Sequence, residues 1–187
     1  ANEIGANALL VRVGALYHDI GKLENPYYFS ENQSGSVSPH DELTPEQSAA
    51  LIINHVKEGI KLAQKYKLPD RIIDFIRTHH GTSSVYYFYK KQLELDPHIP
   101  IENFLYPGPR PFSKETAILM MADAVEAASK SLKSPNLDEL EVFIHEIIEG
   151  KMKELQFNES SITISEIETV KKVLFKRLVN VYQLRIA

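Results

Sequence analysis

Two adjacent histidine–aspartate pairs are the first residues in this chain whose types and spacing could do chemistry. The string LYHDIGK holds His18 and Asp19 behind an apolar run, and the string SPHDELTP holds His40 and Asp41 in a polar stretch. Burying an imidazole and a carboxylate is costly unless they pair with each other or bind a metal ion. The first pair therefore calls for partners, whereas loop polarity and charge near a helix N-terminus explain the second.

Four further residues are candidate partners of the first pair. His55 lies on a predicted helix with Gly59 one turn on, and this glycine costs about 1 kcal/mol of helix propensity, which favours a packing or site role. His79 and His80 are adjacent at a predicted helix end, and Asp123 interrupts the apolar run AILMMADAVEAA. Each alone has an ordinary explanation as a capping, hydrogen-bonded or ion-paired group. Together, imidazoles and carboxylates without thiolates favour a site for manganese, iron, cobalt, zinc or magnesium.

The elements that must position these residues have a helical period almost throughout. Capping boxes at Thr44–Gln47 and Ser165–Glu168 open two helices, and Ser113 and Asn136 cap two others. Residues 24–44 and the proline-rich stretch 96–112 are predicted loops, and residues 157–164 carry weak evidence for an extended segment. The predicted helices cover the chain start to about residue 20, where Gly21 ends the first, then 45–66, 70–80, 84–95, 114–128, 137–155 and 165 to the C-terminus. The prediction is an all-α protein with one domain spanning residues 1–187.

The net charge, the cysteine count and the length of the apolar runs exclude several classes of protein. The 187 residues have a formal net charge of −4, so no general attraction to DNA, duplex RNA or anionic lipid is expected. The absence of cysteine excludes disulfides, thiolate metal sites and thiol nucleophiles. No stretch approaches about 18 consecutive apolar residues, so no membrane span is expected within the chain.

The order of the candidate residues along the chain resembles the order of conserved residues in a known superfamily. An HD pair, a lone histidine, an HH pair and a lone aspartate follow one another as in the HD-domain metal-dependent phosphohydrolases. The strings LYHDIGK, HVKEG, THHGTSSVYYFY and MADAVEAASKSL are similar to the seven-transmembrane-receptor HD family, and within it to its cyclic di-AMP phosphodiesterases. The resemblance covers almost the whole chain, and it implies a single helical HD domain with a buried two-metal site.

The resemblance implies two divalent transition-metal ions, manganese or iron. It gives His18, Asp19 and Asp123 to one ion and His55, His79 and His80 to the other, with Asp19 bridging both. A hydroxide bridging the ions would attack the phosphorus of cyclic di-AMP in line and leave linear pApA. The family has a further histidine upstream of the HD pair, and this chain starts too late to include it, so the first ion is expected to lack one ligand.

The resemblance also sets expectations for the surroundings of the site. The chain is expected to be an N-terminally truncated fragment of a longer, membrane-anchored protein, in the cytoplasm at the inner face of the cell membrane. Related sequences carry a string like SPHDELTP, which places His40 at the mouth of the site but not among the ligands.

Several other residues are candidate helpers. Lys22 follows Asp19 by three residues and is expected to contact phosphate or the nucleophile, as in related HDxxK domains. Thr82 and Ser83 are candidate phosphate contacts. Tyr86 could stack on adenine, at roughly 1–3 kcal/mol per base, although core packing is expected for most of the aromatic residues 86–89. Arg110, on a rigid proline loop, is a candidate for steering phosphate.

The remaining histidines and charges have ordinary explanations. His98 lies in a proline loop, and His145 lies on an amphipathic helix with no carboxylate cluster expected beside it. Glu126 and Lys130 are expected to form an ion pair at helical spacing.

Three other functions stay open at this point. A different HD phosphohydrolase would act on cyclic di-GMP or another nucleotide, but this chain has HHGTSSVYYF where cyclic di-GMP enzymes carry a Gly-Tyr-Pro motif. A di-iron oxygenase would leave Lys22 without a role. A non-catalytic HD sensor or scaffold is expected to have lost ligands, and here all six are present.

Overall fold

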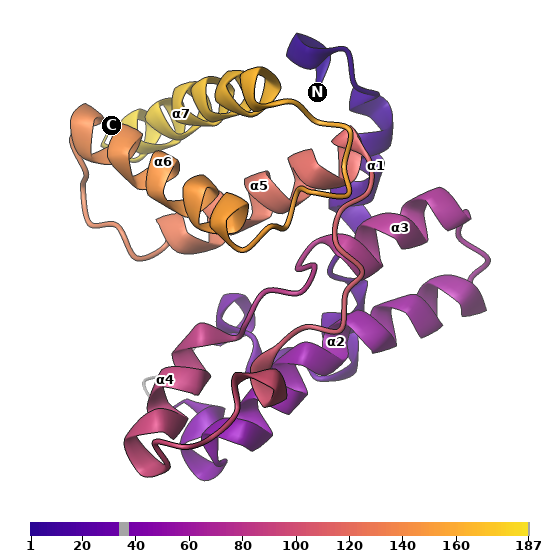
Figure 1. The fold of residues 1–187 in the computed structure, drawn as a ribbon, viewed down its shortest axis with the longest axis vertical. Coiled ribbons are helices and arrows are strands. Elements are labelled where there is room, and N and C mark those ends of the chain that lie inside the picture. Colours follow the sequence, from indigo (N-terminus) through magenta and orange to yellow (C-terminus); the bar gives the residue numbers. More distant parts are fainter. Residues whose placement is uncertain (34–37, 187) are drawn as a thin grey trace. The chain divides into compact units, whose positions relative to one another are not determined.

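The all-α prediction is confirmed by a computed structural model that describes residues 1–33 and 38–186. Within those ranges the extended structure is limited to one isolated bridge, Ser84 to Leu105. The chain divides into two compact units (Figure 1). We call Val13–Pro109 the histidine unit, and Ala1–Arg12 with Arg110–Ala187 the terminal unit. Organisation as one domain over residues 1–187 stays a prediction.

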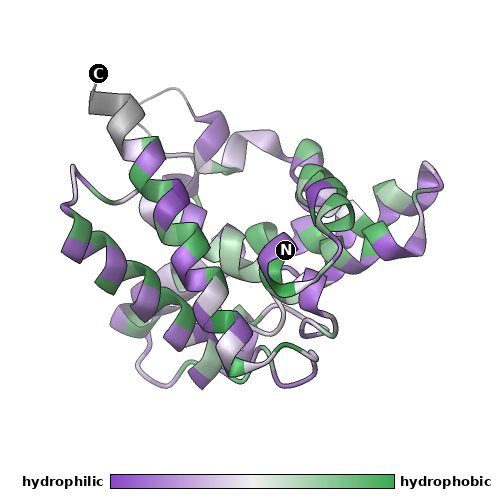
Figure 2. Ribbon diagram, turned by 90° about the horizontal axis from the view of Figure 1, so that it is seen from above, coloured by the Kyte–Doolittle hydropathy of each residue, from purple (hydrophilic) through white to green (hydrophobic). Residues whose placement is uncertain are grey.

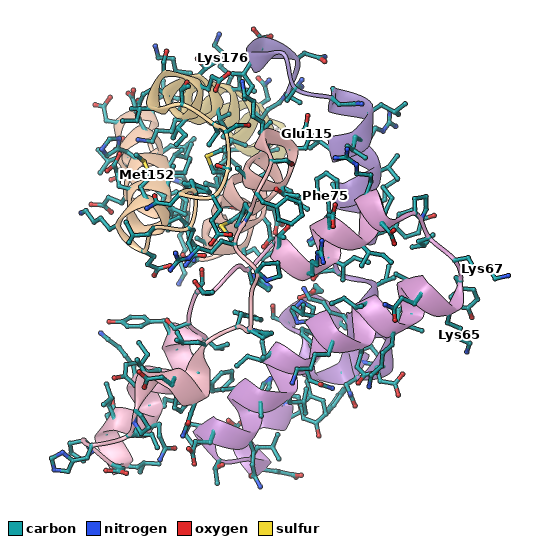
Figure 3. The ribbon with its side chains drawn as sticks, turned by 45° about the vertical axis from the view of Figure 1, so that its right-hand side comes forward. Lys65, Lys67, Phe75, Glu115, Met152 and Lys176 are labelled. Atoms are coloured by element: carbon teal, nitrogen blue, oxygen red, sulfur yellow. The ribbon has the colours of Figure 1, made fainter. Side chains whose placement is uncertain are left out.

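The histidine unit is organised around α2 (Pro45–Lys65). The capping box predicted at its start is present, because Thr44 accepts from the Gln47 N–H and the Gln47 side chain accepts from the Thr44 N–H. Lys65 and Lys67 mark the other end of this helix in Figure 3. The elements that contact α2 are η2 (Ile20–Glu24), α3 (Asp70–Thr78), α4 (Tyr86–Leu95) and the short η6 (Ile101–Phe104).

The terminal unit is built from three helices, α5 (Lys114–Ser129), α6 (Leu137–Lys153) and α7 (Ile164–Ile186). Ser113 and Asn136 cap α5 and α6 as predicted. The helices carry hydrophobic and hydrophilic residues on different faces (Figure 2). The apolar faces bury one core, which includes Met121, Ile148 and Ile167. None of the helices in the described part of the chain is long and apolar enough to cross a membrane.

The first and the last helix differ from the prediction at their N-terminal ends. The first helix, α1, covers only Ala8–Tyr17, and a short 3-10 helix and Gly5 with positive φ precede it. The capping box of α7 uses Thr163 and Glu166 instead of the pair two residues later. Thr163–Glu166 and Ser165–Glu168 each place a hydroxyl three residues before a glutamate, so the sequence pattern alone could not choose between the two pairs.

The predicted loops contain short helical turns. The described part of residues 24–44 holds η3 (Pro26–Tyr28), η4 (Ser30–Asn32) and η5 (Pro39–Glu42), while residues 34–37 of that predicted loop lie outside the described residues. The strand expected at residues 157–164 is absent: turns occupy residues 157–159, a bend follows at residue 160, and α7 begins at Ile164.

Candidate metal centre

Four predicted metal ligands of the histidine unit come together in one cluster. Single ligand atoms of Asp19, His55, His79 and His80 lie within 4.8 Å of one another. His55 Nε2 lies 3.1 Å from His79 Nε2 and 3.3 Å from Asp19 Oδ1. His79 Nε2 lies 3.5 Å from the same carboxylate oxygen. His55 and His79 are buried, so this is an interior site.

The main chain fixes which ring nitrogen faces the cluster. The Nδ1 atoms of His55 and His79 lie 2.6 and 2.8 Å from the carbonyl oxygens of Ile52 and Ile76. A carbonyl oxygen can only accept, so each Nδ1 carries the hydrogen and each Nε2 of a neutral ring presents a lone pair. Such main-chain bonds are the usual way in which proteins orient metal-binding imidazoles.

The converging atoms therefore repel one another in the absence of a cation. Two Nε2 lone pairs and the Asp19 Oδ1 lone pairs face the same point, and within residues 1–33 and 38–186 this buried Oδ1 accepts no hydrogen bond. Leaving a buried acceptor unsatisfied costs about 1–3 kcal/mol. Imidazole nitrogens and a carboxylate oxygen are donors that suit divalent manganese, iron or zinc. The residues present fit a bound metal ion.

Two glycines bring Asp19 to His55. A Cβ on Gly21 would overlap the carbonyl oxygen of His55, and one on Gly59 would lie 2.8 Å from a methyl carbon of Ile76 and 3.3 Å from the Gly21 nitrogen. The backbone of η2 thus lies directly on α2, which only glycine permits at this separation. Gly21 does not end the first helix as predicted, because α1 has already ended at Tyr17. The packing role expected for Gly59 is confirmed.

His18 belongs to the same neighbourhood. Its Nδ1 lies 2.9 Å from the carbonyl oxygen of Ala15, and its Nε2 lies 3.2 Å from Asp19 Oδ2. The ring is thus oriented as in His55 and His79, with Nε2 directed toward the carboxylate. Asp123 is half-buried on α5 of the terminal unit. Its role as a ligand of the first metal ion stays a prediction.

Lys22 lies beside the cluster. Its ammonium donates to Asp19 Oδ2 at 2.7 Å and to Glu31 Oε1 at 2.5 Å. Burial alone lowers the pKa of Lys22, but the charges and hydrogen bonds of Asp19 and Glu31 outweigh burial and raise it above its ordinary value. The ammonium is therefore charged at neutral pH.

Tyr106 is a site residue that the sequence did not reveal. Its buried ring stacks on His80, with centroids 4.2 Å apart and an interplanar angle of 25°. The Tyr106 N–H donates to the Ser83 carbonyl, and the Val85 N–H donates to the Phe104 carbonyl. Those bonds join segments about 20 residues apart, and Tyr106 lies within the predicted proline-rich loop 96–112, so no local pattern points to it. Glu31, the partner of Lys22, lacks a local signal for the same reason.

The other predicted helpers occupy different environments. Ser83 is buried just after the His79–His80 pair and Thr82 is half-buried. Tyr86 is 58% exposed at the start of α4, and Arg110 is half-buried in the terminal unit. Core packing, expected for most of the aromatic residues 86–89, holds for Phe88 and not for Tyr86 or the neighbouring Tyr87. Their contacts with substrate stay predictions.

The second histidine–aspartate pair stands apart from the ligands. His40 Nε2 lies 2.8 Å from the Tyr28 carbonyl oxygen, and its ring packs against Phe88 at a centroid distance of 4.9 Å. Asp41 lies in the first turn of η5, where it accepts from the Ser38 N–H. These contacts agree with the explanation of Asp41 as first-turn charge near a helix N-terminus.

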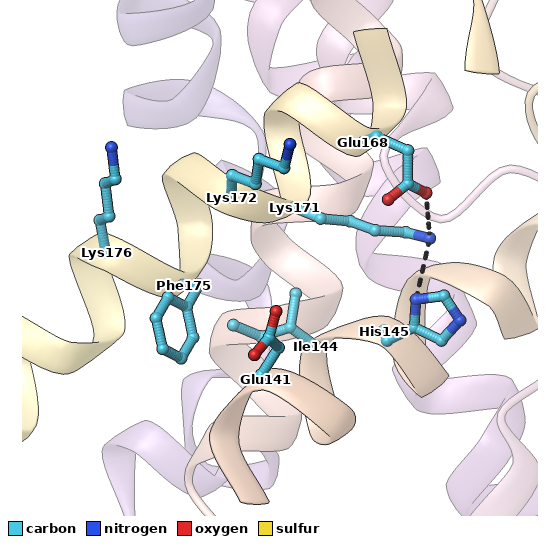
Figure 4. Close-up of a pocket in the computed structure, with 8 residues that line it drawn as sticks. All are labelled: Glu141, Ile144, His145, Glu168, Lys171, Lys172, Phe175 and Lys176. Atoms are coloured by element: carbon cyan, nitrogen blue, oxygen red, sulfur yellow. Dashed lines mark hydrogen bonds and ion pairs between the residues drawn. The ribbon is translucent and has the colours of Figure 1, made fainter. Parts of the chain in front are cut away.

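His145 is not isolated as the sequence suggested. The Lys171 ammonium lies 3.3 Å from its Nδ1 and donates to Glu168 (Figure 4). The same ammonium also donates to Glu149. The cluster was missed because its members come from α6 and α7, more than 20 residues apart. His98 is exposed as expected. The predicted ion pair of Glu126 and Lys130 is present at 3.2 Å.

Comparisons with known proteins agree with this site. A family model described as the HD domain matches residues 1–128. The cyclic-di-AMP phosphodiesterase PgpH of Bacillus subtilis is 44% identical over 183 residues, which is 98% of this chain and 26% of that protein. PgpH of Listeria monocytogenes is 44% identical over 186 residues, covering 100% of this chain and again 26% of the relative. The chain thus spans about a quarter of the length of these relatives.

A solved structure is similar to this chain over nearly the whole length of the chain. The crystal structure of the L. monocytogenes PgpH HD domain in complex with cyclic-di-AMP has a TM-score of 0.95 and 43% sequence identity. The match covers 97% of this chain and 85% of that one. Another crystal structure of the L. monocytogenes PgpH HD domain has a TM-score of 0.92.

Proposed function

The chain belongs to the HD-domain family, and on that premise we propose that it is a metal-dependent phosphodiesterase that hydrolyses cyclic di-AMP to linear pApA. The observation that carries the proposal is the convergence of Asp19 Oδ1, His55 Nε2 and His79 Nε2 within 3.1–3.5 Å, with lone pairs facing one another. The names of the PgpH relatives, and the cyclic-di-AMP complex of the Listeria domain, support the choice of substrate.

Two divalent ions, manganese or iron, are proposed for this site. His55, His79 and His80 would hold one ion, His18 and Asp123 would hold the other, and Asp19 would be shared between them. When bound, such a pair supplies a nucleophile from water at neutral pH and neutralises charge on the phosphoryl oxygens. The lone-pair geometry around Asp19 supports the first set of ligands.

The chain's own groups would hold and orient the substrate. The Lys22 ammonium fixes one Asp19 oxygen at 2.7 Å, which leaves Oδ1 directed toward the histidines. Lys22 carries three hydrogens, so it can also donate to a phosphate oxygen beside the cluster. The stacking of Tyr106 on His80 limits rotation of that ring. Thr82, Ser83, Tyr86 and Arg110 are proposed substrate contacts.

The proposal extends to the protein of which this chain is a part. We propose that the catalytic unit works in the cytoplasm as a part of a larger, membrane-anchored protein. The coverage of the PgpH relatives, 26% of each, supports a longer parent protein.

Hydrolysis of two cyclic dinucleotides tests the function directly. The chain, loaded with Mn²⁺, is incubated with cyclic di-AMP and in parallel with cyclic di-GMP, and products are separated by chromatography. We expect pApA from the first substrate and little product from the second. Metal binding without turnover of either nucleotide would instead favour a scaffold or an oxygenase on the same helical frame.

A further inference from the structure

Lys22 shares its ammonium between two carboxylates that come from different segments of the histidine unit. The ammonium donates to Asp19 Oδ2 at 2.7 Å and to Glu31 Oε1 at 2.5 Å. Asp19 belongs to the metal cluster, whereas Glu31 lies on η4, nine residues beyond Lys22, and belongs to neither group of candidate metal ligands in the described part of the chain. The place of Glu31 beside Lys22 therefore needs an explanation other than metal binding.

The turn that carries Glu31 is held against the metal cluster by Phe29. The Phe29 ring is only 5% exposed, and its centroid lies 5.7 Å from that of the His55 ring and 5.1 Å from the Lys22 ammonium. The Asn32 N–H donates to the Phe29 carbonyl at 2.9 Å, which closes the turn around Glu31. The Glu31 carboxylate is thus presented to Lys22 from a turn with a buried anchor.

An ordinary surface ion pair does not account for this arrangement. Exposed lysine–glutamate pairs stabilise proteins little, and Lys22 is only 22% exposed and already bonded to Asp19. Two carboxylates around one ammonium leave a local excess of negative charge. With a metal ion at the cluster, the hold of Asp19 on Lys22 weakens, because the ion and the ammonium carry charge of the same sign and share one carboxylate. Glu31 is then the carboxylate that keeps the ammonium in place.

The position of the ammonium matters because of what it can still donate. A lysine ammonium carries three hydrogens, and within residues 1–33 and 38–186 Asp19 and Glu31 accept two of them. The partial exposure of Lys22 leaves the ammonium accessible to an acceptor that arrives from solvent, such as a phosphate oxygen. A lysine side chain is long and flexible, and a misplacement of about 1 Å can lower a rate by on the order of 10²-fold.

We infer that Glu31 is a positioning residue, which holds the Lys22 ammonium beside Asp19 so that it can donate to a phosphate oxygen of the substrate. The inference rests on the proposed function, because the phosphodiester is the substrate proposed for the metal cluster. Glu31 acts through Lys22 and does not touch the reacting atoms.

A double-mutant cycle distinguishes this role from a purely structural one. In the Mn²⁺-loaded chain, Glu31→Gln should lower kcat for cyclic di-AMP by about 10-fold, because the ammonium loses its fixed position. In Lys22→Met, the same change should instead raise kcat/KM by about 2- to 5-fold, because it removes a carboxylate that repels the substrate phosphate. No loss in the first background, or a similar loss in both, would overturn the inference.

A matched control separates position from general charge. Glu24→Gln removes an exposed negative charge from η2, two residues beyond Lys22, and should leave kcat unchanged within about 2-fold, since exposed charges at this distance are screened by solvent. Circular dichroism checks the fold of both glutamine variants. A loss in Glu24→Gln equal to that in Glu31→Gln would overturn the inference.

The mobility of the Lys22 ammonium gives a readout that does not depend on turnover. The order parameter of the Lys22 Nζ atom is measured by nitrogen-15 NMR in the Zn²⁺-loaded chain, because Zn²⁺ is diamagnetic. It should fall in Glu31→Gln to the range of exposed lysines such as Lys61 and stay high in Glu24→Gln. An order parameter that Glu31→Gln does not change would overturn the inference.

The two readouts also separate this inference from the proposed function. Hydrolysis of cyclic di-AMP by the unaltered chain, with the same kcat and the same order parameter in Glu31→Gln, would refute the positioning role alone. A fall of the order parameter in Glu31→Gln, with no hydrolysis of cyclic di-AMP by the unaltered chain, would refute the proposed function and leave the contact of Glu31 with Lys22 as a structural one.

Discussion

Each of the two units gathers histidine and carboxylate groups in a cluster, and the two clusters balance the charges and lone pairs of these groups in different ways. In the terminal unit, the Lys171 ammonium lies among the acceptors, 2.8 Å from Glu149, 2.7 Å from Glu168 and 3.3 Å from His145. In the histidine unit, three acceptor atoms of Asp19, His55 and His79 face one another at 3.1–3.5 Å. The cluster of the terminal unit contains its own cation, the Lys171 ammonium. In the histidine unit, the arrangement of acceptor atoms favours a bound cation.

The difference shows how a metal site can be distinguished from an ion-pair network. Both clusters combine imidazole with carboxylate, so residue types alone do not separate them. The roles of the ring nitrogens separate the two clusters. Main-chain carbonyls accept from Nδ1–H of His55 and His79, which leaves both Nε2 atoms as acceptors. Lys22 neutralises only the other Asp19 oxygen.

The largest expected effect is the loss of activity in Asp19→Asn. The amide cannot bridge two ions and presents a donor to the lone pairs of the histidines, so kcat for cyclic di-AMP should fall on the order of 10³-fold or more. Activity assays with metal analysis and circular dichroism measure the effect. A folded variant that keeps more than a tenth of the activity would show that Asp19 has no central role. The histidine cluster could then no longer be distinguished as a metal site from the ion-pair network of the terminal unit.

Removal of metal should destabilise the chain only through the histidine cluster. At a free ion concentration 100 to 1,000 times the Kd, binding adds about 3–4 kcal/mol to the free energy of unfolding. We therefore expect a chelator to lower Tm in the unaltered chain and in Lys171→Met, but not in His55→Ala with His79→Ala. A chelator effect that persists in the histidine double variant would place the ion elsewhere.

Gly21→Ala should disturb the histidine cluster through the backbone. Its Cβ would overlap the His55 carbonyl oxygen, so η2 and α2 must separate, at a cost of about 3 kcal/mol or more. Gly150→Ala is the matched control, because its Cβ would meet no atom within 4 Å and a helical alanine is favoured by about 1 kcal/mol. Urea unfolding measures both, and metal affinity should fall in the first variant alone.

Lys171→Met should have the smallest effect and should depend on pH. The loss of the cation from a partly exposed cluster should lower the free energy of unfolding by about 1–2 kcal/mol. Burial lowers the pKa of Lys171, but bonds to Glu149 and Glu168 outweigh it and raise the pKa above 10.5, so its stabilisation is lost as pH rises through that raised value. Bonding to Lys171 lowers the pKa of Glu149 below 4.5, so that contribution is lost as pH falls below this value.

The difference between the unaltered chain and Lys171→Met should therefore be largest between pH 4.5 and 10.5 and narrow on either side. Thermal unfolding across this range measures it. A difference that stays constant into acid and alkali would mean that packing of the lysine side chain, and not its charge, stabilises the cluster.

The sequence predicted the local features of this protein well and the distant contacts poorly. The capping box of Thr44 and the caps of Ser113 and Asn136 were predicted because each depends on residues within one turn. The candidate ligands His55 and His79 could be named from their order in the chain. The geometry that brings Asp19 to them could not, because it requires the backbone of one segment to lie on another.

The same distinction explains the site residues that were missed. Tyr106 reaches His80 through an isolated bridge between distant segments, and Glu31 meets Lys22 across a predicted loop. His145 seemed isolated because Lys171 lies 26 residues away along the chain. In each case the partner is set by packing between elements, and no local spacing encodes it.

The contact of Gly21 with Gly59 has a consequence for how this protein can change over time. The spacing between Asp19 and His55 is set where main chain touches main chain, so it does not depend on the side chains around it. Exposed neighbours such as Leu23 and Glu24 can therefore be exchanged without moving Asp19 and His55. A designer who wished to give this scaffold a new substrate could exchange exposed residues near the site, provided that these two glycines were kept.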